Sequence, residues 1–497
     1  MATLPSSALL LALAWLAPQR AKKGPDLSEA RKQLSASDEA TFNQGARACS
    51  AADNLEGTEL LLEKLGGSQP HFRDIAFEHL EKITDPYAIG LVENWVETHK
   101  DEMVRAWCAD LLGAYFGKAK TAPLLKAVQE NSVFIKTAAA RALGRLQAKE
   151  AGGRIGSLKS SPDPLLRATA AITVARVDSK SVEGLVKMAT GDKDSGVRAA
   201  CLAALPEIAP NQVLGACEAV LKTPTSDWRA RLTAVECLAK LRTKESVALL
   251  VRQASDARRA VANLSEKTLI AMTGKSFHGG KAWQEWWEAQ GGTFELPAAG
   301  ATGQSPVTGP ATTGVFFDLP VDSDHVAFLI DRGATMSAQA LNLGITKMEA
   351  VIKELETTLK ALPKGNTFFN VYAYSSEPTA WERKPQPLND KTIADSLQFL
   401  KKQPLAGEKN IWAALEAVLA DPDIDTVFLM SDGEPQIGTY VHYNRVVDHL
   451  QRRNVLHRMV VHTVSVSDPS WSDGVKEWYR SQLREIAKGT GGKYVEK

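Results

Sequence analysis

A repeat of about 31 residues constrains the fold of this 497-residue chain more than any other feature of its sequence. Six twelve-residue segments align without gaps, and their first residues lie 31 to 33 positions apart: Phe72, Val104, Ile135, Leu166, Val197 and Ala230. A weaker seventh copy starts at Val261. Apolar residues recur at helical spacing within the segments and between them. Two helices per repeat predict an α-solenoid, in which each unit buries its apolar face against its neighbours.

Charged residues recur at two fixed positions of this repeat. The second residue of the six clear copies is always basic: Arg73, Arg105, Lys136, Arg167, Arg198 and Arg231. Three residues before the start of four copies stands an acid: Asp101, Asp163, Asp194 or Asp227. An Asp at that point is expected to cap the helix by accepting backbone N–H bonds. The basic side chains are then expected to pair with neighbouring Asp residues as a ladder along the solenoid; the alternative is a basic groove for an acidic partner.

This pattern resembles HEAT or HEAT-like repeats, which carry an Asp and a basic residue around the start of their second helix. The resemblance covers residues 55–292, about seven repeats, and implies an extended surface for protein partners. Three tryptophans at helical spacing, Trp283, Trp286 and Trp287, end this region. They are interpreted as a cap on the last repeat, with a ligand cage as the alternative.

The N-terminus contains a short apolar run, ALLLALAWLA, from Ala8 to Ala17. It is too short to span a bilayer, and its length suits the core of a signal peptide, although no basic residue precedes Arg20. Residues 1–21 are therefore predicted to be a signal peptide, which would place the mature protein outside the cytoplasm, in the periplasm or secreted. If the segment is retained, a cytoplasmic protein is expected; mass spectrometry of the mature N-terminus separates the two.

Composition defines the remaining boundaries and excludes some partners. Residues 22–54 are polar and predicted to be a spacer with room for one helix, and residues 293–314, rich in Ala, Gly, Pro and Thr, are predicted to be a flexible linker. The net charge is +1, so neither nucleic acid nor an anionic membrane is indicated as a partner. The five cysteines are an odd count on mostly helical segments and are predicted to be buried free thiols.

From residue 315 to 497 the pattern changes to strands that alternate with helices. Val326–Ile330, Thr426–Met430 and Met459–Val466 are continuous apolar runs, as expected of strands buried on both faces. Amphipathic helices are predicted between them, the longest from Leu341 to Leu362. This alternation predicts a mostly parallel, doubly wound α/β sheet of the Rossmann-like class.

The motifs of this region resemble a von Willebrand factor A (vWA) domain. They are Asp331-Arg332-Gly333-Ala334-Thr335 after the first strong strand, the loop Gly407 to Ile411, and Ser431-Asp432-Gly433 after the later strand. The family usually carries Asp-x-Ser-x-Ser at the first motif, as part of a metal-ion-dependent adhesion site. The resemblance implies that Mg²⁺ or Mn²⁺ would be held by Asp331, Thr335 and Asp432.

Two positions depart from the family pattern. Gly333 replaces a Ser, and Lys409 replaces a Thr. A protonated Lys cannot bind a cation, and at close range it repels Mg²⁺ by several kcal/mol. The hypothesis is that the ammonium of Lys409 lies between Asp331 and Asp432 in place of the metal, with Arg332 as a second positive charge and Ser431 lining the site. The alternative is a solvent-directed Lys409 and a weakly bound cation.

No nucleophile–base pair, nucleotide motif or metal-ligand spacing was found elsewhere in the sequence. The expected function is therefore a non-enzymatic adhesion or scaffold protein that binds unidentified protein partners and needs no cofactor. An accessory subunit of an enzyme or ATPase complex, or an intracellular scaffold, is the alternative. The adhesion idea rests on the fold resemblance alone.

Overall fold

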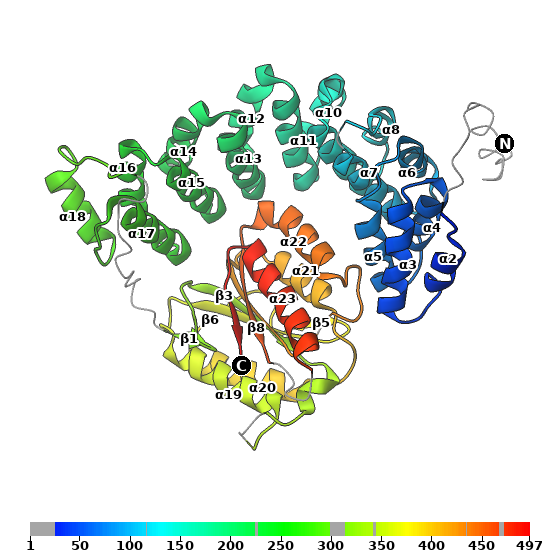
Figure 1. Ribbon diagram of the computed structural model, residues 1–497. Coiled ribbons are helices and arrows are strands. Elements are labelled where there is room, and N and C mark those ends of the chain that lie inside the picture. The colour runs from blue at the N-terminus through cyan, green and yellow to red at the C-terminus, as the bar shows by residue number, and fades with distance from the viewer. Residues whose placement is uncertain are drawn as a thin grey trace.

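The computed structural model describes residues 25–115, 117–223, 227–298, 314–340, 344–433, 435–466 and 472–497. The predicted signal peptide and most of the predicted linker lie outside these residues. None of the described helices is long and apolar enough to cross a membrane. The chain forms a curved array of helix pairs and an α/β domain that lies within the curve (Figure 1).

The array is built from paired helices. The first helices of the pairs are α2 (Ser28–Gln33), α4 (Leu55–Leu65), α6 (Pro86–Thr98), α8 (Ala122–Ala127), α10 (Gly152–Gly156), α12 (Val182–Gly191), α14 (Val213–Lys222) and α16 (Lys244–Gln253). The second helices are α3 (Glu39–Ala52), α5 (Pro70–Leu80), α7 (Glu102–Ala114), α9 (Val133–Arg145), α11 (Pro164–Val177), α13 (Ser195–Ile208), α15 (Trp228–Leu241) and α17 (Arg259–Thr273). The seven sequence copies correspond to α5 through α17, so the weak copy at Val261 is also a helix.

The solenoid begins earlier than the sequence predicted. The described part of residues 22–54 is not a spacer, because it forms α2 and α3. Phe42 and Cys49 are fully buried, and the Phe42 ring stacks on Phe72 of α5 with 4.1 Å between centroids. A few apolar residues are enough here, since the next repeat supplies the other half of the core. At the opposite end, α18 (Gly280–Gln290) buries Trp283 and Trp286 against Phe277 and acts as a cap.

The four predicted capping residues lie at the starts of second helices. Asp101, Asp163, Asp194 and Asp227 each accept a backbone N–H of the helix that follows. Three of the six basic residues pair with other acids, each 25 positions further along the chain. Arg105 pairs with Glu130, Arg167 with Asp192 and Arg231 with Asp256. Arg198 instead donates to the main-chain oxygen of Asp192, six residues before it, at 2.6 Å.

The predicted ladder therefore exists with other partners. The Asp at the helix N-terminus already accepts backbone N–H groups, so the guanidinium pairs instead with an acid that follows the first helix of the next repeat. The side chains of Arg167 and Asp192 are only 5% and 9% exposed, and their pairing joins consecutive repeats. Because these arginines are matched by carboxylates, they do not form the basic groove that was the alternative.

The C-terminal domain is the predicted doubly wound sheet. Its central strands β4 (Phe368–Tyr374), β3 (His325–Asp331), β7 (Thr426–Ser431), β8 (Val460–Ser465) and β9 (Tyr494–Glu496) run parallel in that order. The short strands β5 (Pro378–Ala380) and β6 (Gln386–Pro387) pair antiparallel with β4, and β1 (Val315–Phe316) and β2 (Leu319–Pro320) form a separate hairpin.

Side chains of β3 alternate between two helical layers. Val326, Phe328 and Ile330 face the core formed with α19 (Lys347–Ala361) and α20 (Asp390–Lys402). Ala327 and Leu329 face the core formed with α21 (Ile411–Leu419), α22 (Tyr443–His457) and α23 (Asp473–Gly489). The strand is apolar throughout because both of its faces are covered.

The second of these layers packs against the solenoid. Figure 1 shows the domain on the concave side, with the end of α22 directed toward α13. Gly196 of α13 permits a close approach, because a Cβ added there would lie 2.5 Å from the main-chain oxygen of Leu456. The position therefore requires a residue without a side chain.

Polar contacts hold the domain at both ends of the curve. Near the N-terminal end, the buried carboxylate of Asp74 accepts the backbone N–H groups of Val441 and His442, both at 2.9 Å. Near the C-terminal end, Arg258 donates to the buried Asp425 at 2.7 Å. Each contact satisfies a charged group that would be costly to bury alone. The two domains therefore form one continuous unit.

Between these ends, Asp110 of α7 accepts from Arg141 at 2.8 Å and pairs with Arg452 of α22. Burial opposes its charge, but the two guanidinium groups outweigh that effect and hold the pKa of Asp110 far below its usual range. The solenoid and the α/β domain thus share one buried ion cluster.

Replacing Gly196 with Ala is predicted to weaken this docking. The added Cβ would press on Leu456, although Ala is the better helix former by about 1 kcal/mol. Gly215→Ala in α14 is the matched control, because nothing lies within 4 Å of a Cβ there. In thermal unfolding of the full chain, Gly196→Ala should lower Tm while Gly215→Ala maintains or raises it. An equal rise in both variants would contradict the close contact.

His442 is predicted to make docking pH-dependent. Its ring lies between Glu78, at 2.6 Å, and Glu39, at 3.5 Å. Burial disfavours the charged ring, but the two carboxylates outweigh it and raise the pKa of His442 to about 10. The stabilisation should be complete below the unfolded pKa, near 6.5, and lost as pH rises through about 10.

Urea unfolding at a series of pH values measures this contribution. His442→Gln should lower the free energy of unfolding by about 1.5–3 kcal/mol at pH 6, and the difference should shrink toward pH 10. His278→Gln, at an exposed His, should show no such trend. If the difference in unfolding free energy between wild type and His442→Gln were constant with pH, the charge of His442 would not stabilise the docking.

Candidate functional site

Two buried acids meet at the carboxyl ends of the central strands. Asp331 is the last residue of β3, and Asp432 follows β7 directly. The two strands are paired in register, with Ile330 opposite Met430. Both carboxylates are fully buried. Open α/β sheets place their ligands at this edge, so the strand ends define the candidate site.

Short polar contacts fix the first acid. The hydroxyl of Ser431 donates to Asp331 Oδ2 at 2.8 Å, and the backbone N–H of Gly333 donates to Asp331 Oδ1 at 2.7 Å. Burial is the largest effect on this carboxyl and raises the pKa of Asp331 above its usual value; the charge of Lys409 acts in the opposite direction. Asp331 is thus held by hydrogen bonds from neutral donors.

The second acid, Asp432, forms ion pairs with two lysines. The Lys409 ammonium lies 3.2 Å from Asp432 Oδ1, and the Lys347 ammonium lies 3.0 Å from Asp432 Oδ2. Thr335 donates to Asp432 Oδ1 at 2.8 Å and accepts from Lys409 at 3.0 Å. The structure therefore brings Asp331, Thr335, Lys409 and Asp432 together, with the ammonium against Asp432 and Thr335.

The sequence prediction named Arg332 as the second positive charge. Arg332 is buried and its guanidinium donates to the main-chain oxygen of Gln403; burial lowers its pKa, and the nearby charge of Asp331 opposes that effect. The sequence prediction did not include Lys347, the first residue of α19, which pairs directly with Asp432. Its position was a possible signal, because a cation in the first turn of a helix opposes the helix dipole. Thr346 and Glu349 mark that helix start with a capping box.

The two departures from the family pattern are structurally linked. A Cβ added at Gly333 would lie 3.3 Å from Lys409 Cε, and one added at Gly433 would lie 2.6 Å from Lys409 Nζ. The lysine stem therefore passes close to both glycines. A serine at position 333 would crowd both this stem and Asp331 Oδ1, which lies 3.1 Å from the added Cβ, so the glycine leaves room for Lys409.

These residues do not fit a divalent cation. Both oxygens of Asp432 already face ammonium groups, and Thr335 is hydrogen-bonded to both Asp432 and Lys409. A cation placed among them would meet two positive charges at close range. The lysines supply the charge compensation that buried carboxylates require.

Another group of possible metal ligands lies at the amino-terminal ends of β3 and β7, opposite the candidate site. Asp324, His325 and Asp425 place ligand atoms within 4.8 Å of one another. Arg258 of the solenoid donates to Asp425, and His325 pairs with Asp324 at 3.0 Å. These residues therefore contribute to the contact between the two domains, through the ion pair of Arg258 with Asp425.

Comparisons with known families agree with this architecture. The von Willebrand factor type A domain model matches residues 324–495, and the HEAT repeat model matches residues 121–206 and 182–269. The chain contains HEAT repeats followed by a vWA domain. Two such domains point to a protein-interaction or scaffold role.

Individual relatives are distant. The human von Willebrand factor A domain-containing protein 3B is 22% identical over 172 residues, which are 35% of this chain and only 12% of that protein. A von Willebrand factor type A structure from Catenulispora acidiphila shows 16% identity and a TM-score of 0.29, covering 36% of this chain and 39% of the other. The CpcE–CpcF complex of phycocyanin lyase from Nostoc sp. shows 21% identity and a TM-score of 0.29, covering 47% of this chain and 97% of that one.

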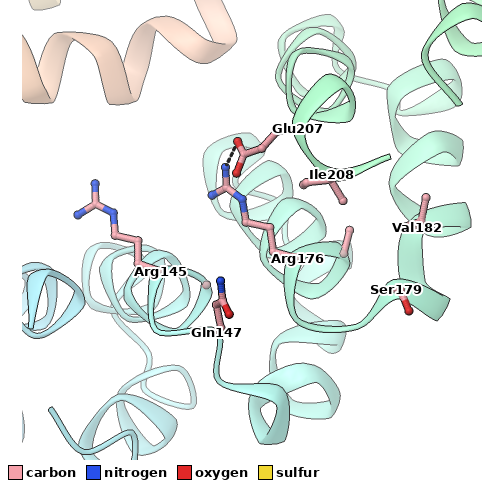
Figure 2. Close-up of a pocket in the computed structure, with 9 residues that line it drawn as sticks. Arg145, Gln147, Arg176, Ser179, Val182, Glu207 and Ile208 are labelled. Carbon is pink, nitrogen blue, oxygen red and sulfur yellow. Dashed lines mark hydrogen bonds and ion pairs between the residues drawn. The ribbon is translucent and has the colours of Figure 1, made fainter. Parts of the chain in front are cut away.

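The HEAT repeats also carry a shallow pocket of about 490 Å³ at the ends of α9, α11 and α13. Figure 2 shows Arg176 paired with Glu207, at 2.8 Å, and Arg145 directed away from this pair. Among the described residues that line it, no side-chain polar atom is buried without a partner. The charged side chains of this pocket therefore pair with each other or face solvent, and they leave no buried polar group for a ligand.

The lysine arrangement predicts how metal binding can be restored. Wild-type protein should show no saturable heat of Mg²⁺ or Mn²⁺ binding by calorimetry. The triple variant Gly333→Ser, Lys347→Ser, Lys409→Thr removes both cations and adds hydroxyls, and should bind with Kd of roughly 10⁻⁴–10⁻³ M. Adding Asp432→Asn to it is the control and should abolish binding. Wild-type binding as tight as that of the triple variant would refute the substitution of metal by lysine.

Proposed function

We propose that this chain is a non-enzymatic scaffold that binds protein partners through the HEAT-repeat surface and the strand-end face of its vWA domain. The strand-end face is the exposed surface of residues 334–335, 377 and 407–408, above the two buried acids. The observation that carries the proposal is the pair of lysines on Asp432. They keep this face preorganised without a metal ion.

A scaffold role is supported by the rigidity of the assembly. The vWA domain contacts the solenoid near α5, α13 and α17, so its strand-end face is held at a fixed place relative to the repeats. Fixed geometry lowers the entropy cost of binding a partner that touches both domains. The solenoid therefore acts as a frame that orients the vWA face.

The chemistry of the side chains supports a role without catalysis. All five cysteines are buried, and burial raises the pKa of Cys49 to about 11, which disfavours the reactive thiolate. A hydrogen bond with Cys217 lowers the pKa of Cys237, but this residue is only 2% exposed and therefore out of reach of a substrate. Asp331 and Asp432 are both occupied by hydrogen bonds or ammonium groups within the protein. The site thus serves structure and recognition.

Partner capture with the full chain tests this function. Thr335→Arg places a long cation on the strand-end face and should reduce the recovery of specific partners about tenfold or more, whereas EDTA should leave the wild-type recovery unchanged. Thr357→Arg, on the exposed side of α19, is the matched control and should behave like wild type. Quantitative mass spectrometry measures the recovery. Partners that are lost with EDTA, or retained by Thr335→Arg, would overturn the proposal.

A further inference from the structure

We propose that a cavity between the two domains binds a neutral, apolar peptide segment of a partner protein. The cavity has a volume of about 680 Å³, within the range of ligand pockets. One wall comes from α7, α9 and the start of α11, and the other from α21, α22 and the loop before α22. Because the two walls come from different domains, a ligand in the cavity would contact both domains at once. The cavity is separate from the strand-end face.

Aromatic side chains form much of its lining. Trp107 comes from the solenoid, and Trp412 and Tyr440 come from the vWA domain. The Trp412 and Tyr440 rings meet edge to face with 5.0 Å between centroids, and the Trp107 ring lies 6.4 Å from Tyr440. The three residues are only 3–5% exposed, so the rings form a rigid apolar floor of the cavity, and the accessible apolar area comes from its rim.

The apolar surface continues out of the cavity onto the solenoid. Val133 and Phe134, in the first turn of α9, line the cavity and are 39% and 56% exposed. They are two of only four large hydrophobic side chains that are exposed in the described part of the chain. An apolar surface that extends beyond the cavity fits a peptide chain better than a compact small molecule.

The charges in the lining are already matched. Arg141 and Arg452 pair with Asp110, and Arg453 pairs with Glu416 at 2.9 Å. His449 and His457 are neutral, because burial and neighbouring arginines lower the pKa of each ring, that of His457 to about 4. A charged ligand would have to displace one of these internal partners, so the cavity favours a neutral one.

One buried polar atom in the lining, His449 Nε2, has no hydrogen-bond partner among the described residues. The Trp107 indole, by contrast, is hydrogen-bonded to Tyr440. A neutral imidazole nitrogen is a donor or an acceptor, according to the tautomer. A peptide main chain carries both N–H and carbonyl groups beside its apolar side chains, so it can pair with His449 in either tautomer while it fills the apolar part of the cavity.

Fluorescence anisotropy of the full-length protein with two labelled peptides tests this site. One is the blocked hexapeptide Ser-Gly-Leu-Trp-Gly-Ser; in the other, Ser-Asn replaces Leu-Trp. The apolar peptide should bind at least tenfold more tightly, because burial of its two side chains drives binding. Equal affinities, or no saturation by the apolar peptide up to about 1 mM, would overturn the proposal.

Variants locate the binding. His449→Phe keeps an aromatic ring but removes the unpaired nitrogen, and should weaken binding of the apolar peptide about three- to tenfold. Phe134→Ser, at an exposed position, should weaken it roughly tenfold without affecting folding. Tyr87→Ser is the matched control, since Tyr87 is 67% exposed on α6 and outside the cavity. Unchanged affinity in both cavity variants would exclude this location.

The strand-end variant Thr335→Arg separates this inference from the scaffold proposal. It should leave the affinity for the apolar peptide unchanged, because Thr335 does not line the cavity. Loss of partner recovery with intact peptide binding, or the reverse, would show which of the two sites fails.

Discussion

The compensation of buried carboxylates is the constraint on which this structure depends. Asp432 at the strand ends, Asp110 at the domain boundary and Asp425 at the far ends of the strands are all nearly inaccessible to water. Each is matched by Lys or Arg side chains from another element of the fold. Removing one partner of a buried ion pair typically costs about 3–5 kcal/mol, so each pair fixes the relative position of two elements.

At the strand ends of the vWA domain, the need to compensate buried carboxylates is met by lysines. Two lysines take the place in which the family resemblance implies a cation, and the small side chains of Gly333 and Gly433 leave room for one of them. The charge of a lysine is covalently part of the chain, so it does not depend on metal concentration. The face above the acids can thus keep one geometry under all conditions in which the lysines are protonated.

The same constraint explains why the vWA domain occupies the concave side of the solenoid. The repeats alone would leave Asp74 and Asp110 near an open surface, and the docked domain supplies their hydrogen-bond partners. Docking leaves a cavity between the middle repeats and α22, where the contact is less complete. The concave surface of the HEAT repeats is therefore shared between an internal contact and a space for a partner.

The helices, the strands and the approximate place of the strand-end site could be predicted from the sequence, because local periodicity and composition determine them. The 31-residue repeat predicted the helix pairs, the apolar runs predicted the buried parallel strands, and Asp331, Lys409 and Asp432 could be placed at one sheet edge from strand order.

Other features depend on contacts between residues far apart in the chain. Lys347 reaches Asp432 across 85 positions, and Asp74 reaches His442 across 368. The ladder partners and the helices α2 and α3 also follow from packing of neighbouring repeats. The sequence alone determined which elements form, because that is a local property; only the tertiary structure decided which charges compensate which, because that depends on how the elements pack.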